Sequence, residues 1–300
     1  MRLIAFAREQ GPGLGIVEPG GEEVRDLHAV RPELPRDLGG VLANGEEGLA
    51  ALREAVETAG GSRKARLGRR DLEALAPIPR PARNVICVGK NYAAHAGELS
   101  GAAGAASGVD EEIPEYPIFF TKAPSAVIGP GAAIPAGRDE TGSVDYEGEV
   151  AVILARGGRD LPAGEAWEHV FGLMLVNDVT SRALQRRHGQ WFLGKSLDGF
   201  CPTGPEVVTP DELPPLPELR ITTHVNGELR QSGSLGDLIF SIPELIESLS
   251  RRMTLEPGDI IATGTPRGVG VAFDPPRYLA PGDRVVVAAS GLGELANPVA

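Results

Sequence analysis

Short apolar runs bounded by turn residues recur along almost the whole chain. In the first part they cover residues 3–7, 14–17 and 23–27. Further along, the stretches that share this pattern are residues 85–88, 150–154, 173–176, 221–225, 260–262 and 285–288. Runs of this length between turn residues are typical of β-strands. Asn226-Gly227 follows one of these runs directly and predicts a tight hairpin.

Helical periodicity is confined to a few stretches. Residues 49–58 carry apolar side chains on one stripe and predict a short helix. Residues 243–249 repeat the pattern, with Ser241 placed to cap the first turn. The sequence therefore predicts a mixed α/β fold that is predominantly β. The 40 glycines and 26 prolines agree with this prediction, because many short strands need many turns.

Three prolines, Pro77, Pro79 and Pro81, mark a stiff linker. We place a domain boundary there, which gives a small β-rich N-terminal domain over residues 1–78 and a larger domain over residues 79–300. Within the larger domain, residues 101–108 consist of glycine, alanine and one serine. A low-complexity segment of this kind cannot build a core, so we expect it to be mobile.

The charge balance narrows the choice of partners. With 29 basic and 41 acidic side chains the net charge is −12, which argues against a nucleic-acid partner. The basic stretch at residues 63–70 is then a solvated connector. No apolar stretch is long enough to cross a membrane, and the N-terminus lacks the apolar segment of a signal peptide. Cys87 and Cys201 lie outside any CxxC pattern, so we expect a cytoplasmic chain with two reduced thiols.

Acidic residues at two strand ends are candidate metal ligands. Asp145, Glu147 and Glu149 alternate before an apolar run, so on an extended chain they share one face. Asp178 closes another apolar run and can supply a further ligand. Carboxylates favour hard cations such as Mg²⁺, Mn²⁺ or Ca²⁺. The alternatives are an exposed acidic strand face for the first group and a turn or helix cap for Asp178.

A histidine and a glutamate form a candidate acid–base pair. If residues 91–98 are helical, His95 and Glu98 face the same side, and Glu98 can orient the imidazole for general base catalysis. Residues 99–116 follow this pair and include the low-complexity segment. They suggest a lid that completes the site on closure. The alternative is an ordinary exposed histidine beside a solvated glutamate.

Further polar residues suit an anionic substrate. Arg182 and Gln185 lie one helical turn apart and can bind a carboxylate, although a surface pair is the commoner fate of such residues. Lys195 lies in apolar surroundings, where it can stabilise a developing enolate. The backbone amides of the glycine-rich turn at residues 263–270 can hold an anion. The chain has no GxGxxG, GxSxG or HExxH motif, so nucleotide cofactors, serine hydrolysis and zinc proteolysis lack support.

Several of these motifs stand in the order found in the fumarylacetoacetate hydrolase family, which the chain resembles over roughly residues 80–300. The matching segments are residues 88–95, 144–149, 177–182, 194–196, 255–259 and 262–266. Residues 1–78 are similar to the small N-terminal domain of many bacterial members. The resemblance implies a strongly twisted β-roll as catalytic domain and a homodimer.

The resemblance also implies a role for each candidate residue. The implied cofactor is Mg²⁺ or Mn²⁺, with Ca²⁺ as a further candidate. The implied metal ligands are Glu147, Glu149 and Asp178. The residues implied to line the pocket of a small 2-oxo acid are Arg182, Gln185, Lys195 and Thr265. The implied catalytic pair on the lid is His95 and Glu98, with Lys195 stabilising the enolate.

The function implied by this resemblance is the metal-dependent hydrolysis of a carbon–carbon bond in acylpyruvate or fumarylpyruvate-type 2,4-dioxo acids. Oxaloacetate decarboxylation and the isomerisation or decarboxylation of 2-hydroxyhepta-2,4-diene-1,7-dioate are alternatives, because they share a metal-stabilised enolate. A catalytically silent ligand-binding protein is an alternative from another class, although such a protein has no need of His95 and Glu98.

Overall fold

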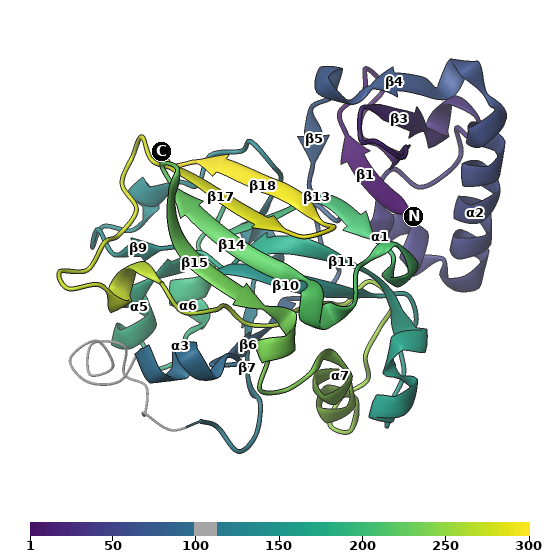
Figure 1. Ribbon diagram of the computed structural model, residues 1–300. Coiled ribbons are helices and arrows are strands. Elements are labelled where there is room, and N and C mark those ends of the chain that lie inside the picture. The colour runs from purple at the N-terminus through teal and green to yellow at the C-terminus, as the bar shows by residue number, and fades with distance from the viewer. Residues whose placement is uncertain (99–112) are drawn as a thin grey trace.

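The computed structural model describes residues 1–98 and 113–300, and its fold is mixed α/β, as predicted (Figure 1). A large twisted sheet runs through the molecule. Its strand order is β4-β3-β2-β1-β13-β11-β10-β16-β6-β7, with the short strands β5 (Ala74–Leu75) and β8 (Val127–Ile128) at its side. No helix among the described residues has the length and apolar character needed to span a membrane.

The N-terminal part forms one end of this sheet. Its strands are β1 (Arg2–Phe6), β2 (Gly13–Val17), β3 (Glu23–Asp26) and β4 (Arg66–Gly68). Helices α1 (Leu38–Ala43) and α2 (Gly45–Gly61) complete this part, with α2 on its outer side (Figure 1). The helix predicted at residues 49–58 is thus confirmed but is longer at both ends.

The remaining strands of the large sheet come from distant parts of the chain. They are β6 (Val85–Gly89), β7 (Ile118–Lys122), β10 (Gly148–Leu154), β11 (Val170–Asn177), β13 (Cys201–Val208) and β16 (Ile260–Ala262). Strands β10, β11 and β13 are buried along their whole length, and in β10 and β11 this explains the continuous apolar runs. Antiparallel pairing of β1 with β13 joins the N-terminal strands to them. The domain boundary at residue 78 stays a prediction.

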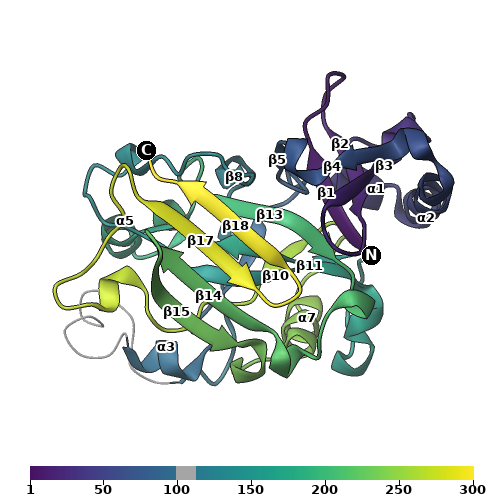
Figure 2. The ribbon, with the colours of Figure 1, turned by 45° about the horizontal axis from the view of Figure 1, so that its top comes forward.

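A second sheet covers the large one. Its order is β15 (Glu228–Ser234), β14 (Arg220–Val225), β17 (Arg284–Ala289) and β18 (Gly293–Pro298), and Figure 2 shows it in front of β10 and β11. Val150, Leu173, Ile221 and Val287 belong to one core cluster between the sheets. The predicted hairpin at Asn226-Gly227 joins β14 to β15.

Helix α7 (Ile242–Ser250) lies beside these sheets and begins as predicted, because Ser241 and Glu244 form a capping box. The short elements β9 (Val144–Asp145), β12 (Thr180–Ser181), α3 (Ala93–Glu98), α5 (Arg182–Arg187) and α6 (Phe192–Lys195) carry the candidate site. Figures 1 and 2 both show α3 and α5 on the same side of the molecule. The predicted low-complexity segment at residues 101–108 lies outside the described residues.

The basic stretch at residues 63–70 pairs with acidic neighbours. Arg66 lies within ion-pair distance of Glu23, and Arg70 lies within ion-pair distance of Glu22. Arg69 pairs with the buried carboxylate of Glu206 on β13. The stretch therefore connects the parts of the large sheet.

Candidate active site

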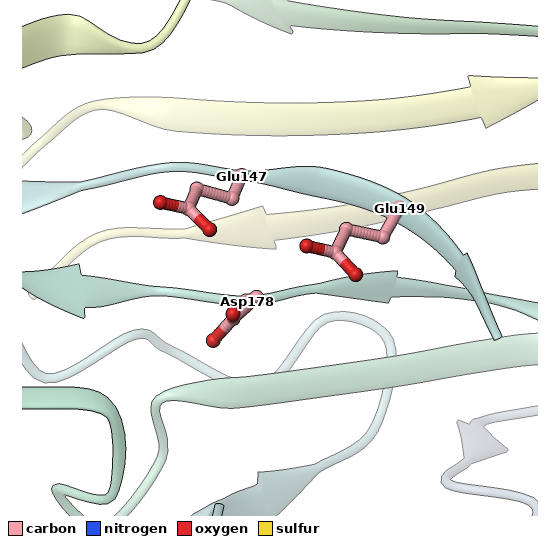
Figure 3. Close-up of side chains that lie close together, drawn as sticks. All are labelled: Glu147, Glu149 and Asp178. Atoms are coloured by element: carbon pink, nitrogen blue, oxygen red, sulfur yellow. The ribbon is translucent and has the colours of Figure 1, made fainter. Parts of the chain in front are cut away.

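Three buried carboxylates meet where β10 and β11 lie side by side. Glu147 precedes β10, Glu149 lies within it, and Asp178 follows β11 directly. The antiparallel pairing of Gly148 with Asn177 brings them together. One oxygen of each carboxylate lies within 4.8 Å of the others, and Figure 3 shows the three side chains turned toward a common space.

Asp145 does not belong to this cluster. Strand β9 ends at Asp145 and β10 begins at Gly148, so the backbone is not continuously extended between them. The carboxylate of Asp145 accepts hydrogen bonds from the backbone amides of Gly270 and Val271 at 2.7 and 3.0 Å. The prediction that Asp145 points the same way as Glu147 and Glu149 is therefore wrong.

Three cationic side chains contact the cluster. The ammonium group of Lys195 donates to Glu147 Oε2 and to Asp178 Oδ2, each at 2.7 Å. Lys122 donates to Asp178 Oδ1 at 2.5 Å, and Arg182 forms an ion pair of 2.6 Å with Glu147 Oε1. The sequence reasoning missed Lys122, which is fully buried at the end of β7. A lysine at the end of an apolar strand is the signal that could have found it.

The pKa values of the two glutamates of the cluster are shifted in opposite directions. Burial alone would raise the pKa of Glu147, but the positive charges of Lys195 and Arg182 outweigh burial and lower the pKa to about 2. Burial, with the negative charges of Asp178 and Glu147, instead raises the pKa of Glu149 well above its usual value. Its carboxylate accepts a hydrogen bond from the backbone amide of Gly264 at 2.9 Å.

These three side chains fit a divalent cation. They offer only carboxylate oxygens, the ligands that Mg²⁺, Mn²⁺ and Ca²⁺ prefer. Burial raises the pKa of Glu149 most, and the negative charges of Asp178 and Glu147 raise it further; a bound cation would relieve this repulsion. The donor set alone does not select among the three ions.

His95 and Glu98 form the predicted pair. His95 Nδ1 lies 2.8 Å from Glu98 Oε1, and the backbone amide of Gly268 donates to both oxygens of Glu98 at 2.8 and 2.9 Å. The exposed fractions of the two side chains are 6% and 11%, so the alternative of an exposed pair is wrong. The lid predicted at residues 99–116 lies largely outside the described residues and stays a prediction.

The predicted substrate-binding residues surround the same space. Arg182 donates through Nε to Asp145 at 2.8 Å and through Nη1 to Gln185 Oε1 at 3.2 Å. Thr265 donates to the carbonyl of Gly148 at 3.0 Å. Thr265 also accepts from Gln231 at 2.7 Å, a contact that the sequence did not suggest.

One small cavity collects most of the candidate residues. It has a volume of about 30 Å³. The candidate residues that line it are His95, Glu147, Glu149, Arg182, Gln185, Lys195 and Thr265. The cavity also exposes the rings of Phe120 and Trp191, which the candidate set did not include. Acid–base, cationic and carboxylate groups thus share one enclosed space.

The glycine-rich turn at residues 263–270 binds carboxylates of the chain itself. The amide of Gly264 donates to Glu149, that of Gly268 to Glu98 and that of Gly270 to Asp145. The amides that were expected to bind an anion thus bind carboxylates of the protein itself. The turn orients three of the site's acidic side chains.

Comparisons with known proteins show the family of the chain. Residues 84–300 match the family model described as fumarylacetoacetate (FAA) hydrolase C-terminal. The chain is 50% identical over 224 residues to the oxaloacetate tautomerase YisK of Bacillus subtilis (strain 168), covering 75% of this chain and 72% of that protein.

Two solved structures cover the whole chain. A fumarylacetoacetate hydrolase from psychrophilic Exiguobacterium antarcticum has a TM-score of 0.83 and 42% identity, covering 100% of this chain and 99% of that one. A maleylpyruvate hydrolase from Sphingobium sp. SYK-6, in complex with manganese(II) and pyruvate, has a TM-score of 0.76 and 32% identity, covering 100% and 98%. The chain is therefore an enzyme of the fumarylacetoacetate hydrolase family, with a buried carboxylate cluster that fits a divalent cation.

Proposed function

We propose that the protein is a divalent-metal-dependent hydrolase that cleaves the carbon–carbon bond of acylpyruvate-type 2,4-dioxo acids. One observation carries the proposal: His95, which is hydrogen-bonded to Glu98, lines the same cavity as Glu147, Glu149 and Lys195. An oriented histidine is the group that such a reaction needs to activate water. The maleylpyruvate hydrolase named above, similar over its whole length, carries manganese and pyruvate.

Glu147, Glu149 and Asp178 would hold the cation. A bound divalent cation would polarise the 2-oxo group and carboxylate of a substrate and stabilise the negative charge that develops there. Arg182 donates to Gln185 Oε1 and so fixes the amide, whose Nε2 is then the group that can donate to an anionic substrate. The hydroxyl of Thr265 lines the same cavity.

The hydrogen bonds of Glu98 determine which nitrogen of His95 acts as the base. Glu98 accepts from the Gly268 amide, and it accepts from His95 Nδ1 as well in the tautomer that carries the proton on Nδ1. Nε2 is then unprotonated and can take a proton from water. The hydroxyl adds to the distal carbonyl carbon and the bond to the pyruvate portion breaks. The bonding electrons form the pyruvate enolate, which Lys195 stabilises until His95 returns the proton to carbon.

The test is the ultraviolet enol absorbance of acetylpyruvate, followed with EDTA-stripped protein before and after Mg²⁺ is added. We expect loss of absorbance only with the metal, accompanied by one pyruvate per substrate consumed. His95→Ala is expected to keep Mn²⁺ binding while turnover falls about 10²–10⁴-fold. Unchanged turnover in this variant, or metal-loaded wild-type protein that leaves acetylpyruvate intact, would refute the proposal.

Oxaloacetate tautomerisation is the second candidate, favoured by the 50% identity to the Bacillus subtilis tautomerase. His95 would then move a proton between carbon and oxygen of the substrate, with no water added. Oxaloacetate whose enol form decays without pyruvate would support tautomerisation. Release of pyruvate and carbon dioxide from oxaloacetate would instead support the decarboxylase alternative.

We also propose that the chain acts as a homodimer. Light scattering on the purified protein is expected to give twice the chain mass of 31.4 kDa. A mass of one chain at micromolar concentration would refute this proposal.

A further inference from the structure

A buried amide side chain of the second sheet contacts the segment that carries two of the candidate metal ligands. Gln231 lies on β15 and is 1% exposed. Its Oε1 accepts a hydrogen bond from the backbone amide of Gly148 at 3.0 Å. Gly148 stands between Glu147 and Glu149, so the position of its backbone determines how these two carboxylates are spaced. Gln231 itself is not among the residues that line the catalytic cavity.

A backbone irregularity directs Gln231 toward this segment. Thr223 of β14 pairs with Gln231, whereas the next residue, His224, pairs with Leu229. Arg230 is therefore the extra residue of a β-bulge, a feature that changes the regular alternation of side chains along a strand. In a regular strand Leu229 and Gln231 would share a face, but Leu229 is 54% exposed and Gln231 is buried. The bulge thus allows the amide to face the large sheet.

The same side chain holds the glycine-rich turn. Gln231 Nε2 donates to Thr265 Oγ1 and to the carbonyl oxygen of Pro266, each at 2.7 Å. Thr265 in turn donates to the carbonyl oxygen of Gly148 at 3.0 Å. Both hydrogens of the Gln231 amide are therefore used, and the N–H and the C=O of Gly148 are both fixed.

The network also reaches the carboxylate of Glu149. The amide of Gly264, the residue before Thr265, donates to Glu149 Oε2 at 2.9 Å. Because Gln231 holds the two residues that follow Gly264, it restrains this donor as well. Packing adds to the restraint, since a Cβ at Gly148 would lie 2.1 Å from a side-chain oxygen of β14. The backbone and the carboxylate of Glu149 are thus held from two directions.

A fixed spacing of ligand oxygens matters more for a small cation than for a large one. Mg²⁺ binds oxygen at about 2.0–2.1 Å and demands near-ideal octahedral geometry, whereas Ca²⁺ binds at about 2.3–2.6 Å and accepts irregular arrangements. A network that restrains Glu147 and Glu149 therefore favours Mg²⁺. Loss of the restraint should cost Mg²⁺ affinity more than Ca²⁺ affinity.

We propose that Gln231 is a positioning residue of the metal site, which fixes the spacing of Glu147 and Glu149 and thereby favours Mg²⁺ over Ca²⁺. This inference rests on the cation site of the proposed function. It assigns to a side chain that would not itself bind the cation a selectivity that the three carboxylates alone do not provide.

The test measures metal binding in the absence of substrate. Protein freed of metal and of EDTA is titrated calorimetrically with Mg²⁺ and, separately, with Ca²⁺. Gln231→Met keeps the length of the side chain and removes its hydrogen bonds. We expect Kd to rise about 10- to 100-fold for Mg²⁺ and by less than about threefold for Ca²⁺. Equal changes for the two ions, or no change for Mg²⁺, would overturn the inference.

Asn297 provides a matched control. It is another buried side-chain amide, 2% exposed, and its Nδ2 donates to the carbonyl oxygens of Gly129 and Ala132 at 2.9 and 2.8 Å. Both Gln231→Met and Asn297→Leu are expected to lower Tm, because each removes buried hydrogen bonds. The ratio of the two Kd values should change only in Gln231→Met. If Asn297→Leu shifts this ratio equally, the effect follows from lost stability and the inference fails.

Thr265→Val tests the same network with a smaller change. It removes the hydroxyl that links Gln231 to the carbonyl of Gly148 and nearly keeps the shape of the side chain. We expect the Kd for Mg²⁺ to rise about tenfold, again more than the Kd for Ca²⁺. This variant decides the question if Gln231→Met does not fold, and an unchanged ratio in it would then refute the positioning role.

These titrations separate the inference from the proposed reaction. If the ratio shifts in Gln231→Met but acetylpyruvate is not cleaved by metal-loaded wild-type protein, the proposed reaction fails and the positioning role stands. If acetylpyruvate is cleaved and the ratio is unchanged, the reaction stands and the positioning role fails. Wild-type protein that binds neither ion would refute both.

Discussion

Glu149 is the residue of the carboxylate cluster whose charge is least compensated. Lys195, Lys122 and Arg182 contact Glu147 or Asp178, whereas Glu149 accepts a hydrogen bond from the amide of Gly264. Glu149→Gln keeps the shape and removes the charge. We expect metal affinity to fall by more than about 100-fold while metal-free protein gains a few degrees in Tm, because like-charge repulsion is relieved. Mn²⁺ titration and thermal denaturation in EDTA measure the two effects.

A variant that loses metal affinity without any gain in metal-free stability would contradict this assignment of repulsion. Glu147→Gln is the matched control. Glu147 is compensated by Lys195 and Arg182, so the same change there should destabilise metal-free protein.

The raised pKa of Glu149 also predicts how metal binding depends on pH. The carboxyl group of the metal-free protein keeps its proton to a higher pH than an exposed glutamate does. A cation binds the ionised carboxylate, so each ion must displace this proton. Affinity should therefore rise with pH until the raised pKa is passed and level off above it. Calorimetry in buffers of different ionisation enthalpy measures the released proton. Proton release that is unchanged in Glu149→Gln would contradict the assignment of this proton to Glu149.

At the scale of single residues, the motifs of the sequence predicted which side chains form the site, which composition alone could not do. The nine candidate residues lie close together, because strand ends and helix spacing can be recognised locally and motif order adds the rest. Asp145 and Arg230 show what local patterns miss. The direction of Asp145 depends on a break between β9 and β10, and that of Arg230 on a bulge. Neither feature has a local sequence signal.

Among the elements, β10 and β11 were predicted from their unbroken apolar runs, whereas β13 was not predicted. Residues 150–154 and 173–176 lie within the fully buried strands β10 and β11. Strand β13 contains Pro202, Gly204 and Pro205, which are typical of a turn. It is tolerated because its pairing with β11 shifts register between Leu173 and Leu175. Only the tertiary arrangement reveals this.

The glycine-rich turn makes a prediction of its own. Gly268 has φ of +107°, and a Cβ there would lie 1.9 Å from the carbonyl oxygen of Arg230. Gly268→Ala must therefore move the turn away from β15 and from Glu98, which the Gly268 amide holds. We expect a loss of about 2–4 kcal/mol in stability and of most activity, measured by denaturant unfolding and turnover.

Gly131 is the control for the backbone angle alone. It has φ of +75°, and a Cβ there would meet nothing within 4 Å. Gly131→Ala should cost about 1 kcal/mol and leave turnover unchanged. If Gly268→Ala were as mild as this control, the close approach of the turn to Arg230 would not matter for the site.

At the scale of the whole molecule, the N-terminal strands and the catalytic strands share one sheet and one core. A single hydrophobic cluster contains Leu14 and Leu52 from the N-terminal part together with Met174 and Cys201. Glu206, fully buried on β13, pairs with Arg2 of β1 and with Arg69. The linker prolines predicted a domain boundary at residue 78. Contacts between distant segments, however, decide whether the two parts unfold together.

Both tryptophans, Trp167 and Trp191, lie in residues 79–300, so their fluorescence reports only the catalytic part, whereas far-ultraviolet circular dichroism reports both. Because the core is shared, we expect the two signals to give one coincident unfolding transition. Glu206→Gln leaves two arginines without their buried partner. It should therefore lower the free energy of unfolding reported by both signals, by about 2 kcal/mol. Circular dichroism that falls before fluorescence would instead show that residues 1–78 unfold as a separate domain, and the shared sheet would then contribute little to cooperativity.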